Sequence, residues 1–232
     1  MKKFLKEKVY NFNIKLDEQR LSNLFAFYEY LQEINAHTNL IAKADPETII
    51  LKHFIDSLHF IKLFPQKPFK LLDIGSGGGF PAIPIQIIYP VSQIFAVDSI
   101  GKKVNFLNES AKKVGLDNFC AIQSRAEDLP QSFLESFDYV TARAVSSLNI
   151  LSEYCIPYLK IGGKFVAYKS KTAKEEIEQA KNAIKILGGE IIDIIEYKLD
   201  DFERNLIVIE KIAKTPIQYP RKAGLPKKAP LS

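Results

Sequence analysis

A cluster of glycines is the feature of this sequence best suited to binding a ligand. Four of the 11 glycines lie within residues 75–79, just after Asp73, and Phe80-Pro81 follows them. Glycine allows positive φ and close approach of the backbone to a ligand. A nucleotide P-loop would end in Gly-Lys-Ser/Thr, and a dinucleotide loop would have glycine at the position of Phe80. Both phosphate-binding sites are therefore disfavoured.

The acid before the glycines points to a cationic ligand. Asp-x-Gly-x-Gly-x-Gly at the end of a strand, here with Asp73, Gly75 and Gly77, resembles the cofactor loop of class I S-adenosylmethionine methyltransferases. This cofactor carries an amino group and a sulfonium but no phosphate, so a carboxylate suits it. The simpler alternative is a glycine-rich turn between a strand and a helix, and the acid together with four glycines disfavours it.

Two more polar segments follow expected strands. Asp98 lies 19 positions after Gly79, where an acid can accept hydrogen bonds from ribose hydroxyls or cap the next helix, and both roles can hold at once. The segment 124–128 contains Ala126 and Glu127. In a methyltransferase fold this loop borders the adenine, and the alternative is a polar turn with helix caps.

Alternating strands and helices must position these groups. We expect strands at 70–74, 94–98, 118–123, 137–142 and 164–169, with helices near 80–89, 102–114, 147–158 and 174–187. Repeated strand–helix units predict an α/β fold with a doubly wound, mainly parallel, Rossmann-like sheet. The apolar runs 190–198 and 205–211 predict an antiparallel strand pair at the sheet edge.

Helices are expected before the first strand. Apolar spacing predicts one over 17–37, and Asp45-Pro46 begins another that runs to about residue 63. We therefore divide a single integrated domain into an N-terminal helical cap (1–68), a methyltransferase core (69–213) and a basic tail (214–232). His53, Asp56 and Ser57 share one helical face, and we expect them to pack the cap against the core.

The positive charge is concentrated at the end of the chain. Of the net charge of +5, residues 1–210 carry −1 and the last 22 residues carry +6. Prolines at 216, 220, 226 and 230 indicate that the tail forms neither a helix nor a central strand, but is extended and either mobile or laid along a surface. Such an arm is suited to binding a phosphate backbone. The alternative, which the composition supports equally, is a solvated tail that aids solubility.

Composition excludes several classes of protein. The chain is 47% hydrophobic and 25% charged, which is typical of globular proteins. We find no apolar stretch near the ~18 residues of a membrane span and no secretory signal at the start. Cys120 and Cys155 are expected to be buried apolar residues, and the three histidines do not have the spacing of a metal site. We expect a cytoplasmic protein without a metal.

Motifs along nearly the whole chain resemble the bacterial small-subunit ribosomal RNA guanine-N7 methyltransferases, the RsmG/GidB family. They are Asn39-Leu40, the 53–57 segment, the 73–85 segment, Val97-Asp98-Ser99, the 101–107 segment, the 124–127 segment, Thr141-Ala142-Arg143-Ala144, Arg204-Asn205-Leu206 and the 219–224 segment. The glycine loop is shared with many methyltransferases. Its combination with Phe80-Pro81, Ala126-Glu127 and Ala142-Arg143-Ala144 is far more selective.

The resemblance implies roles for particular residues. Gly75, Phe80, Ala126-Glu127 and Arg143 would contact S-adenosylmethionine, and Asp98 would bind its ribose. For Arg143 two roles stay open: it would pair with the methionine carboxylate or frame the pocket, or it would reach guanine O6 or an RNA phosphate. The candidate RNA contacts are Lys169, Arg204, Arg221 and Lys222, although each alone is better explained as a solvated charge.

The expected chemistry agrees with guanine N7 as the acceptor. The segment after the fourth strand, 141–145, lacks the Asn/Asp-Pro-Pro-Tyr/Phe pattern that accompanies amine methylation, and neither cysteine is placed as a nucleophile. Guanine N7 has an in-plane lone pair and no proton, so in-line displacement needs no general base, and we assign no catalytic residue. The partner would be small-subunit rRNA or a ribosomal particle, with the protein a monomer. The alternative is a methyltransferase for another RNA or a small molecule.

Overall fold

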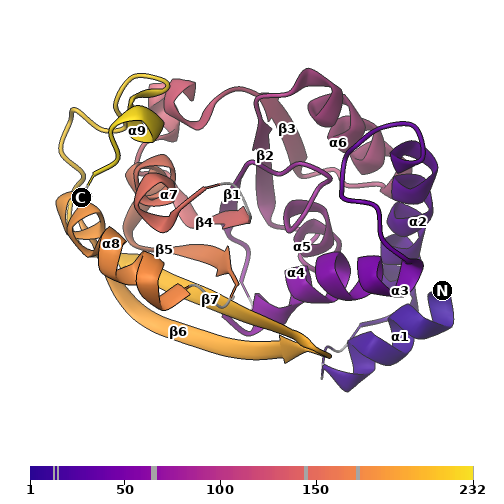
Figure 1. Ribbon diagram of the computed structural model, residues 1–232. Coiled ribbons are helices and arrows are strands. Elements are labelled where there is room, and N and C mark those ends of the chain that lie inside the picture. The colour runs from indigo at the N-terminus through magenta and orange to yellow at the C-terminus, as the bar shows by residue number, and fades with distance from the viewer. Residues whose placement is uncertain (13, 15, 64–66, 144–145, 171–172, 232) are drawn as a thin grey trace.

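The computed structural model describes residues 1–12, 14, 16–63, 67–143, 146–170 and 173–231. Within these residues, one sheet has seven strands in the order β3-β2-β1-β4-β5-β7-β6 (Figure 1). The strands are β1 (Lys70–Ile74), β2 (Gln93–Asp98), β3 (Phe119–Gln123), β4 (Phe137–Arg143), β5 (Leu159–Lys169), β6 (Gly189–Leu199) and β7 (Phe202–Lys211).

The sheet is mainly parallel, as expected. Strands β1 to β5 pair in parallel, whereas β7 runs antiparallel to both β5 and β6. The carboxyl ends of β1 to β4 therefore meet at one edge, where open α/β sheets bind their ligands. The predicted α/β fold with a C-terminal antiparallel strand pair is confirmed.

Helices cover both faces of this sheet. Alternate strand residues enter two separate cores: Leu71 packs into one and Leu72 into the other. The first core includes α5 (Ala82–Ile88) and α6 (Gly101–Val114). The second includes α7 (Leu148–Cys155) and α8 (Ala173–Ile186).

The N-terminal helices complete the first core. Asp17 caps α2 (Glu18–Asn35) by accepting a hydrogen bond from the Arg20 amide, and α2 packs against α5 and α6. The next helical stretch consists of α3 (Pro46–Ile49), a π-helical turn (Ile50–Ile55), α4 (Asp56–Leu58) and a 3-10 turn (His59–Leu63). The predicted helix from Asp45 to about 63 is thus present, but it is irregular at its centre.

Three details differ from the sequence expectations. The helix α1 (Lys2–Asn11) was not predicted, because only Leu5 and Val9 form its buried stripe. Cys120 is exposed, contrary to expectation, because β3 pairs only with β2 at the sheet edge. Cys155 is buried as expected. The tail contains a short helix, α9 (Leu225–Lys228), because Pro226 lies in its first turn, where proline needs no amide donor.

The tail does not project into solvent. It packs against α7 through α9, and near its end the Leu231 carbonyl accepts a hydrogen bond from Asn149 Nδ2 of α7 at 3.2 Å. No helix among the described residues is long and apolar enough to cross a membrane. The division into cap, core and tail remains a prediction.

Candidate functional site

The glycine loop joins the end of β1 to α5. Gly75 and Gly77 have φ values of 75° and 55°, which L-residues with side chains rarely adopt. The amides of Gly75 and Ser76 donate to the Val97 carbonyl at 2.8 and 3.0 Å. The loop is therefore fixed against the end of β2, with its backbone turned toward the carboxyl edge of the sheet.

Asp98, at the end of β2, contacts the same loop. Its Oδ2 accepts a hydrogen bond from the Gly77 amide at 3.0 Å, and its Oδ1 accepts one from the Ile100 amide at 3.0 Å. Lys103 Nζ lies 3.7 Å from Oδ2. One carboxylate thus links the glycine loop to Ile100, the residue before α6. Ile100, and not Asp98, is the N-cap of α6, and the predicted ribose contact stays a prediction.

A cavity of about 450 Å³ lies at this edge of the sheet. It is bounded by the glycine loop, the end of β2, the loop after β3, the end of β4 and the tail. Its lining includes five of the eight predicted cofactor residues: Gly75, Asp98, Ala126, Glu127 and Arg143. Four segments that are far apart in the sequence therefore bring predicted cofactor residues around one space, as the motif analysis requires.

Asp73 lies on the central strand and does not line the cavity. It is 1% exposed, and its Oδ1 accepts a hydrogen bond from Thr141 Oγ1 at 2.7 Å. Among the described residues its Oδ2 has no hydrogen-bond partner. Burial raises the pKa of this carboxyl to about 6, so Asp73 is a buried acid with unused acceptor capacity.

Phe80 does not line the cavity either. It is 2% exposed and packs among the rings of Phe27, Phe54 and His53, with centroids 5.0–5.3 Å away. The Arg143 guanidinium carbon lies 5.3 Å from the centroid of the Phe80 ring. Phe80 therefore supports Arg143 from the cap side of the site.

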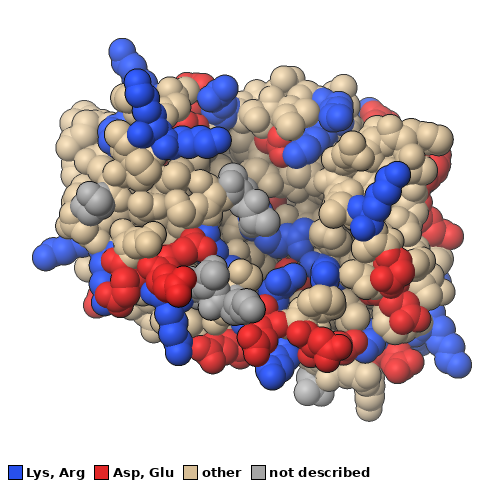
Figure 2. All heavy atoms as spheres, in the orientation of Figure 1, with Lys and Arg blue, Asp and Glu red and all other residues tan. Residues whose placement is uncertain are grey.

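A second cavity, of about 600 Å³, lies on the other side of Arg143. Residues from the cap, β4, β5, α8 and β7 line it: Ala42, Lys52, His53, Asp56, Arg143, Ser146, Tyr168, Lys169, Ser170, Glu176 and Arg204. Figure 2 shows a hollow in the middle of this face with basic side chains in its floor. Arg143 belongs to the lining of both cavities, so the two spaces are neighbours.

Hydrogen bonds from the cap orient the Arg143 guanidinium. Its Nη1 donates to the Lys52 carbonyl at 2.8 Å and lies 3.3 Å from Asp56 Oδ2, and its Nη2 lies 2.7 Å from His53 Nδ1. Arginine is only a donor, so His53 Nδ1 is the acceptor. Burial and the nearby Arg143 lower the pKa of His53 to about 3. His53 is therefore neutral at physiological pH.

Asp56 connects the cap to the last two strands. It is 2% exposed, and its Oδ1 accepts a hydrogen bond from Tyr197 Oη at 2.6 Å and lies 3.6 Å from Arg204 Nε. Three donors from β4, β6 and β7 thus converge on one carboxylate. The expected polar cluster between cap and core is present at His53 and Asp56, and it also lines the second cavity.

The four predicted RNA contacts lie in different surroundings. Lys169 and Arg204 line the second cavity, and Lys169 Nζ is 2.6 Å from both Glu176 Oε2 and the Ser146 carbonyl. Arg221 Nη2 lies 2.6 Å from Oε2 of Glu153 in α7, and Lys222 is exposed. Hence two of the four lie together, while Arg221 is engaged within the protein.

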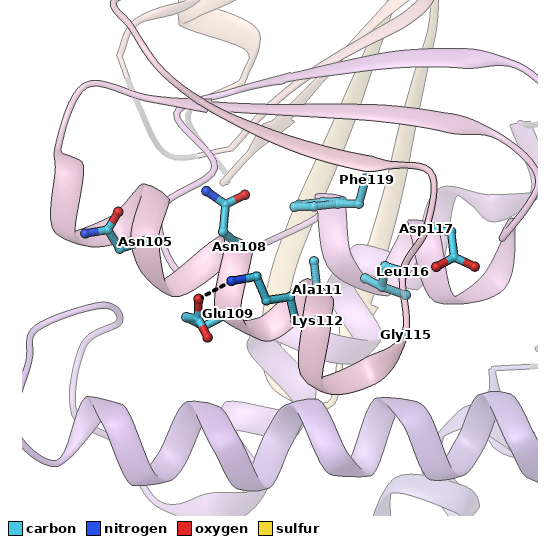
Figure 3. Close-up of a pocket in the computed structure, with 9 residues that line it drawn as sticks. All are labelled: Asn105, Asn108, Glu109, Ala111, Lys112, Gly115, Leu116, Asp117 and Phe119. Atoms are coloured by element: carbon cyan, nitrogen blue, oxygen red, sulfur yellow. Dashed lines mark hydrogen bonds and ion pairs between the residues drawn. The ribbon is translucent and has the colours of Figure 1, made fainter.

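A third cavity, of about 550 Å³, is unsuited to this chemistry. Its lining comes from α6 and the loop to β3: Asn105, Asn108, Glu109, Ala111, Lys112, Gly115, Leu116, Asp117 and Phe119 (Figure 3). Glu109 and Lys112 are exposed and paired at 2.7 Å. The cavity lies at the amino end of β3, opposite the glycine loop. Among the described residues, no group of His, Cys, Asp and Glu is arranged to bind a metal ion.

Sequence reasoning missed several residues of the two cavities. Lys103 and Tyr154 line the first, and Lys52 lines the second. Lys103 follows Asp98 within a recognised motif and could have been found there. Tyr197 and Lys52 carry no local signal, because only the packing of the cap on β6 and β7 brings them to the site. Ala144, part of the Arg143 motif, lies outside the described residues.

Solved structures with low sequence identity share this fold. The TYW2 protein of M. jannaschii, in complex with AdoMet, has a TM-score of 0.57 at 17% identity, over 68% of this chain and 76% of that one. The ribosomal protein L11 methylase of Lactobacillus delbrueckii subsp. bulgaricus has a TM-score of 0.56 at 16% identity, over 75% of this chain and 82% of that one. The Rossmann-like methyltransferase fold is therefore confirmed.

Closer relatives match almost the whole chain. The ribosomal RNA small subunit methyltransferase G of Acetivibrio thermocellus is 42% identical, over 100% of this chain and 97% of its own length. The same-named protein of Desulforamulus reducens is 43% identical, over 98% of this chain and 97% of its own length. A sequence model of the GidB family, rRNA small subunit methyltransferase G, matches residues 20–207. The chain therefore belongs to the GidB family of rRNA small-subunit methyltransferases.

Proposed function

We propose that this protein transfers a methyl group from S-adenosylmethionine to N7 of a guanine in small-subunit ribosomal RNA. The observation that carries the proposal is the pair of cavities that share Arg143. One is formed largely by loops at the carboxyl edge of the sheet, and the other is lined by basic side chains. A donor and an acceptor in adjacent cavities would meet at their common wall, which is the arrangement that group transfer requires.

The residues of the first cavity fit S-adenosylmethionine. The unpartnered Oδ2 of buried Asp73 supplies negative charge for a cationic ligand close to the cavity. Gly75 presents backbone without a side chain, Asp98 has carboxylate oxygens for ribose hydroxyls, and Ala126-Glu127 borders the adenine. When bound, this cofactor supplies a methyl group on a positively charged sulfur.

The second cavity fits an RNA base. Lys52, Arg143, Lys169 and Arg204 all line it, and such side chains bind phosphates and the acceptor edge of guanine. Acids in the lining, Asp56 and Glu176, are paired with these cations. Four cations against two acids leave an excess of positive charge in the lining, which favours an anionic nucleic acid over a neutral small molecule as the acceptor.

The titratable groups of this cavity agree with an acceptor that needs no deprotonation. His53 has a pKa of about 3, and its Nδ1 already accepts a hydrogen bond from Arg143. Asp56 is surrounded by Arg143, Tyr197 and Arg204. His53 is therefore not poised to take a proton from the substrate at neutral pH, and the Asp56 oxygens already accept hydrogen bonds from within the protein. Guanine N7 requires no such transfer, so the chain's main contributions are orientation and electrostatics.

Base mapping tests the proposal. Small-subunit particles and free rRNA from a bacterial strain lacking this gene are incubated with the protein and tritiated S-adenosylmethionine. We expect label in rRNA at N7 of one guanine, and heat-inactivated protein serves as the control. Label on another base, on ribosomal protein only, or on an added small molecule would overturn the proposal.

The proposal also includes a monomeric, cytoplasmic protein that needs no metal. Sedimentation of the purified chain at micromolar concentration tests the monomer, for which we expect a mass near 26.3 kDa. Methyl transfer that continues in the presence of EDTA would agree with a metal-free reaction. A stable dimer or loss of activity in EDTA would contradict these points.

A further inference from the structure

The C-terminal tail returns to the cofactor cavity. After β7 the chain passes the end of α8, where Thr215 Oγ1 donates to the Leu187 carbonyl at 2.7 Å. It then crosses α7, and the short helix α9 lies beside that helix (Figure 1). Gly224 and Lys227 belong to the lining of the 450 Å³ cavity. A segment expected to bind RNA thus forms part of the pocket assigned to the cofactor.

One buried ion pair attaches this segment to α7. Arg221 Nε lies 2.8 and 3.1 Å from the two oxygens of Glu153, and Arg221 Nη2 lies 2.6 Å from Oε2. The Arg221 amide also donates to Glu153 Oε1 at 2.9 Å. Glu153 is only 1% exposed, and a buried carboxylate requires such pairing. Arg221 therefore anchors the tail to α7.

Three residues beyond this point, the tail contacts a predicted adenine-binding residue. The Gly224 amide donates to Glu127 Oε1 at 3.0 Å. Burial and the Glu127 carboxylate raise the pKa of Tyr154 to about 12, so Tyr154 stays protonated beside this acid. The Glu127 carboxylate is thus flanked by α7 and by the tail.

We propose that residues 221–228 form a wall of the S-adenosylmethionine cavity, with Arg221 and Gly224 as positioning residues. Arg221 fixes the segment on Glu153, and Gly224 orients the Glu127 carboxylate. The identity of the ligand rests on the proposed function above. The tail therefore contributes to cofactor affinity, and bound cofactor stabilises the tail in its position. This role is separate from any contact with RNA.

Calorimetry with S-adenosylhomocysteine tests the wall. Arg221→Gln removes the anchor, and we expect the Kd to rise about tenfold because the segment is no longer held. Lys214→Gln removes the same charge from an exposed position of the tail that lies before this segment and outside the cavity lining, and its Kd should stay within about twofold of wild type. Circular dichroism of both variants checks that they are folded.

Limited proteolysis tests the same wall without a substitution. Trypsin cleaves after Arg221, Lys222, Lys227 and Lys228, and mass spectrometry follows each product in the wild-type chain. Saturating S-adenosylhomocysteine should slow these cleavages about tenfold, while cleavage after exposed Lys6 in α1 is unchanged. Binding with an unchanged Kd in Arg221→Gln and no protection of the tail would overturn this inference alone. If the wild-type chain does not bind the ligand, the proposed function fails as well.

Discussion

The two cavities on either side of Arg143 are built in different ways. The cofactor cavity is lined mainly by short segments at the ends of the consecutive strands β1 to β4. The acceptor cavity is lined by several charged side chains, which come from the cap, β4, β5, α8 and β7. Local sequence therefore specifies the first cavity, and only tertiary packing assembles the second.

Removal of the shared residue should have the largest effect. Arg143→Ala removes the side chain that lines both cavities, and it leaves the buried Asp56 carboxylate with one fewer hydrogen-bond donor. We expect kcat/KM for rRNA methylation to fall about thousandfold, or ~4 kcal/mol in transition-state free energy. Arg143→Lys keeps the charge without the planar fork and should recover only part of the loss.

Steady-state assays with labelled cofactor measure both variants. Near-normal activity of the Arg143→Ala protein would contradict the claim that the methyl donor and the acceptor meet at the wall that the two cavities share.

Removal of the Asp98 carboxylate should weaken cofactor binding without changing rRNA binding. Asp98→Ala removes the acceptor for the Gly77 amide and the predicted ribose contact, so we expect the Kd for S-adenosylhomocysteine to rise about hundredfold, or ~2.7 kcal/mol. Asp117→Ala, at an exposed position by the third cavity, is the control. Binding to rRNA, measured by filter retention without cofactor, should not change. Equal losses of RNA and cofactor binding would show that Asp98 acts through general stability instead.

The buried acid should make cofactor binding depend on pH. Asp73 has a pKa of about 6 without ligand, and a cationic ligand favours its charged form. The affinity for S-adenosylmethionine should therefore increase about tenfold between pH 5 and pH 7. Asp73→Asn should weaken binding at pH 7 and remove this difference, as calorimetry at several pH values would detect.

The same raised pKa has the opposite effect on the stability of the ligand-free protein, which should decrease as the pH rises. The folded-state pKa is raised above the value of 3.8 for an ordinary Asp, so the native state takes up more protons between these values than the unfolded chain. The contribution of Asp73 to the unfolding free energy therefore decreases by about 3 kcal/mol in total as the pH rises from 3.8 to about 6. The difference in unfolding free energy between wild type and Asp73→Asn, followed by urea denaturation, should change with pH accordingly. A constant difference would contradict the raised pKa of this buried carboxyl.

The smallest effect is expected on the acceptor side. Arg204→Gln removes one cation from the second cavity, and we expect rRNA binding to weaken about threefold with a shallower salt dependence. Cofactor affinity should not change. Lys112→Gln, which removes an exposed charge on α6, is the control. If Arg204→Gln weakens cofactor binding but not RNA binding, the two cavities have been assigned the wrong ligands.

The same contrast explains what could be predicted from the sequence. The strands, the order of strand–helix units and the residues Gly75, Asp98 and Ala126-Glu127 follow from local patterns and motifs. The RsmG/GidB resemblance correctly indicated the family. The side chain of Phe80 is buried among aromatic rings, which the motif did not indicate, and its predicted contact with the cofactor stays a prediction.

The course of the tail could not be predicted either. Charge and proline content suggested an extended arm, yet Arg221 pairs with buried Glu153, 68 positions earlier in the chain. Such a pairing depends on how α7 packs on the sheet, and composition carries no information about it. Lys52 and Tyr197 were missed for the same reason, since the cap and the last two strands meet only in the folded protein.

The central claim is that the cavity between the glycine loop and Glu127 binds S-adenosylmethionine. A crystal structure with S-adenosylhomocysteine tests it most directly. We predict the ligand between Gly75 and Ala126, with its ribose at Asp98 and its sulfur toward the Arg143 wall. Density for the ligand in the acceptor cavity, or no binding at the carboxyl edge of β1 and β2, would contradict it.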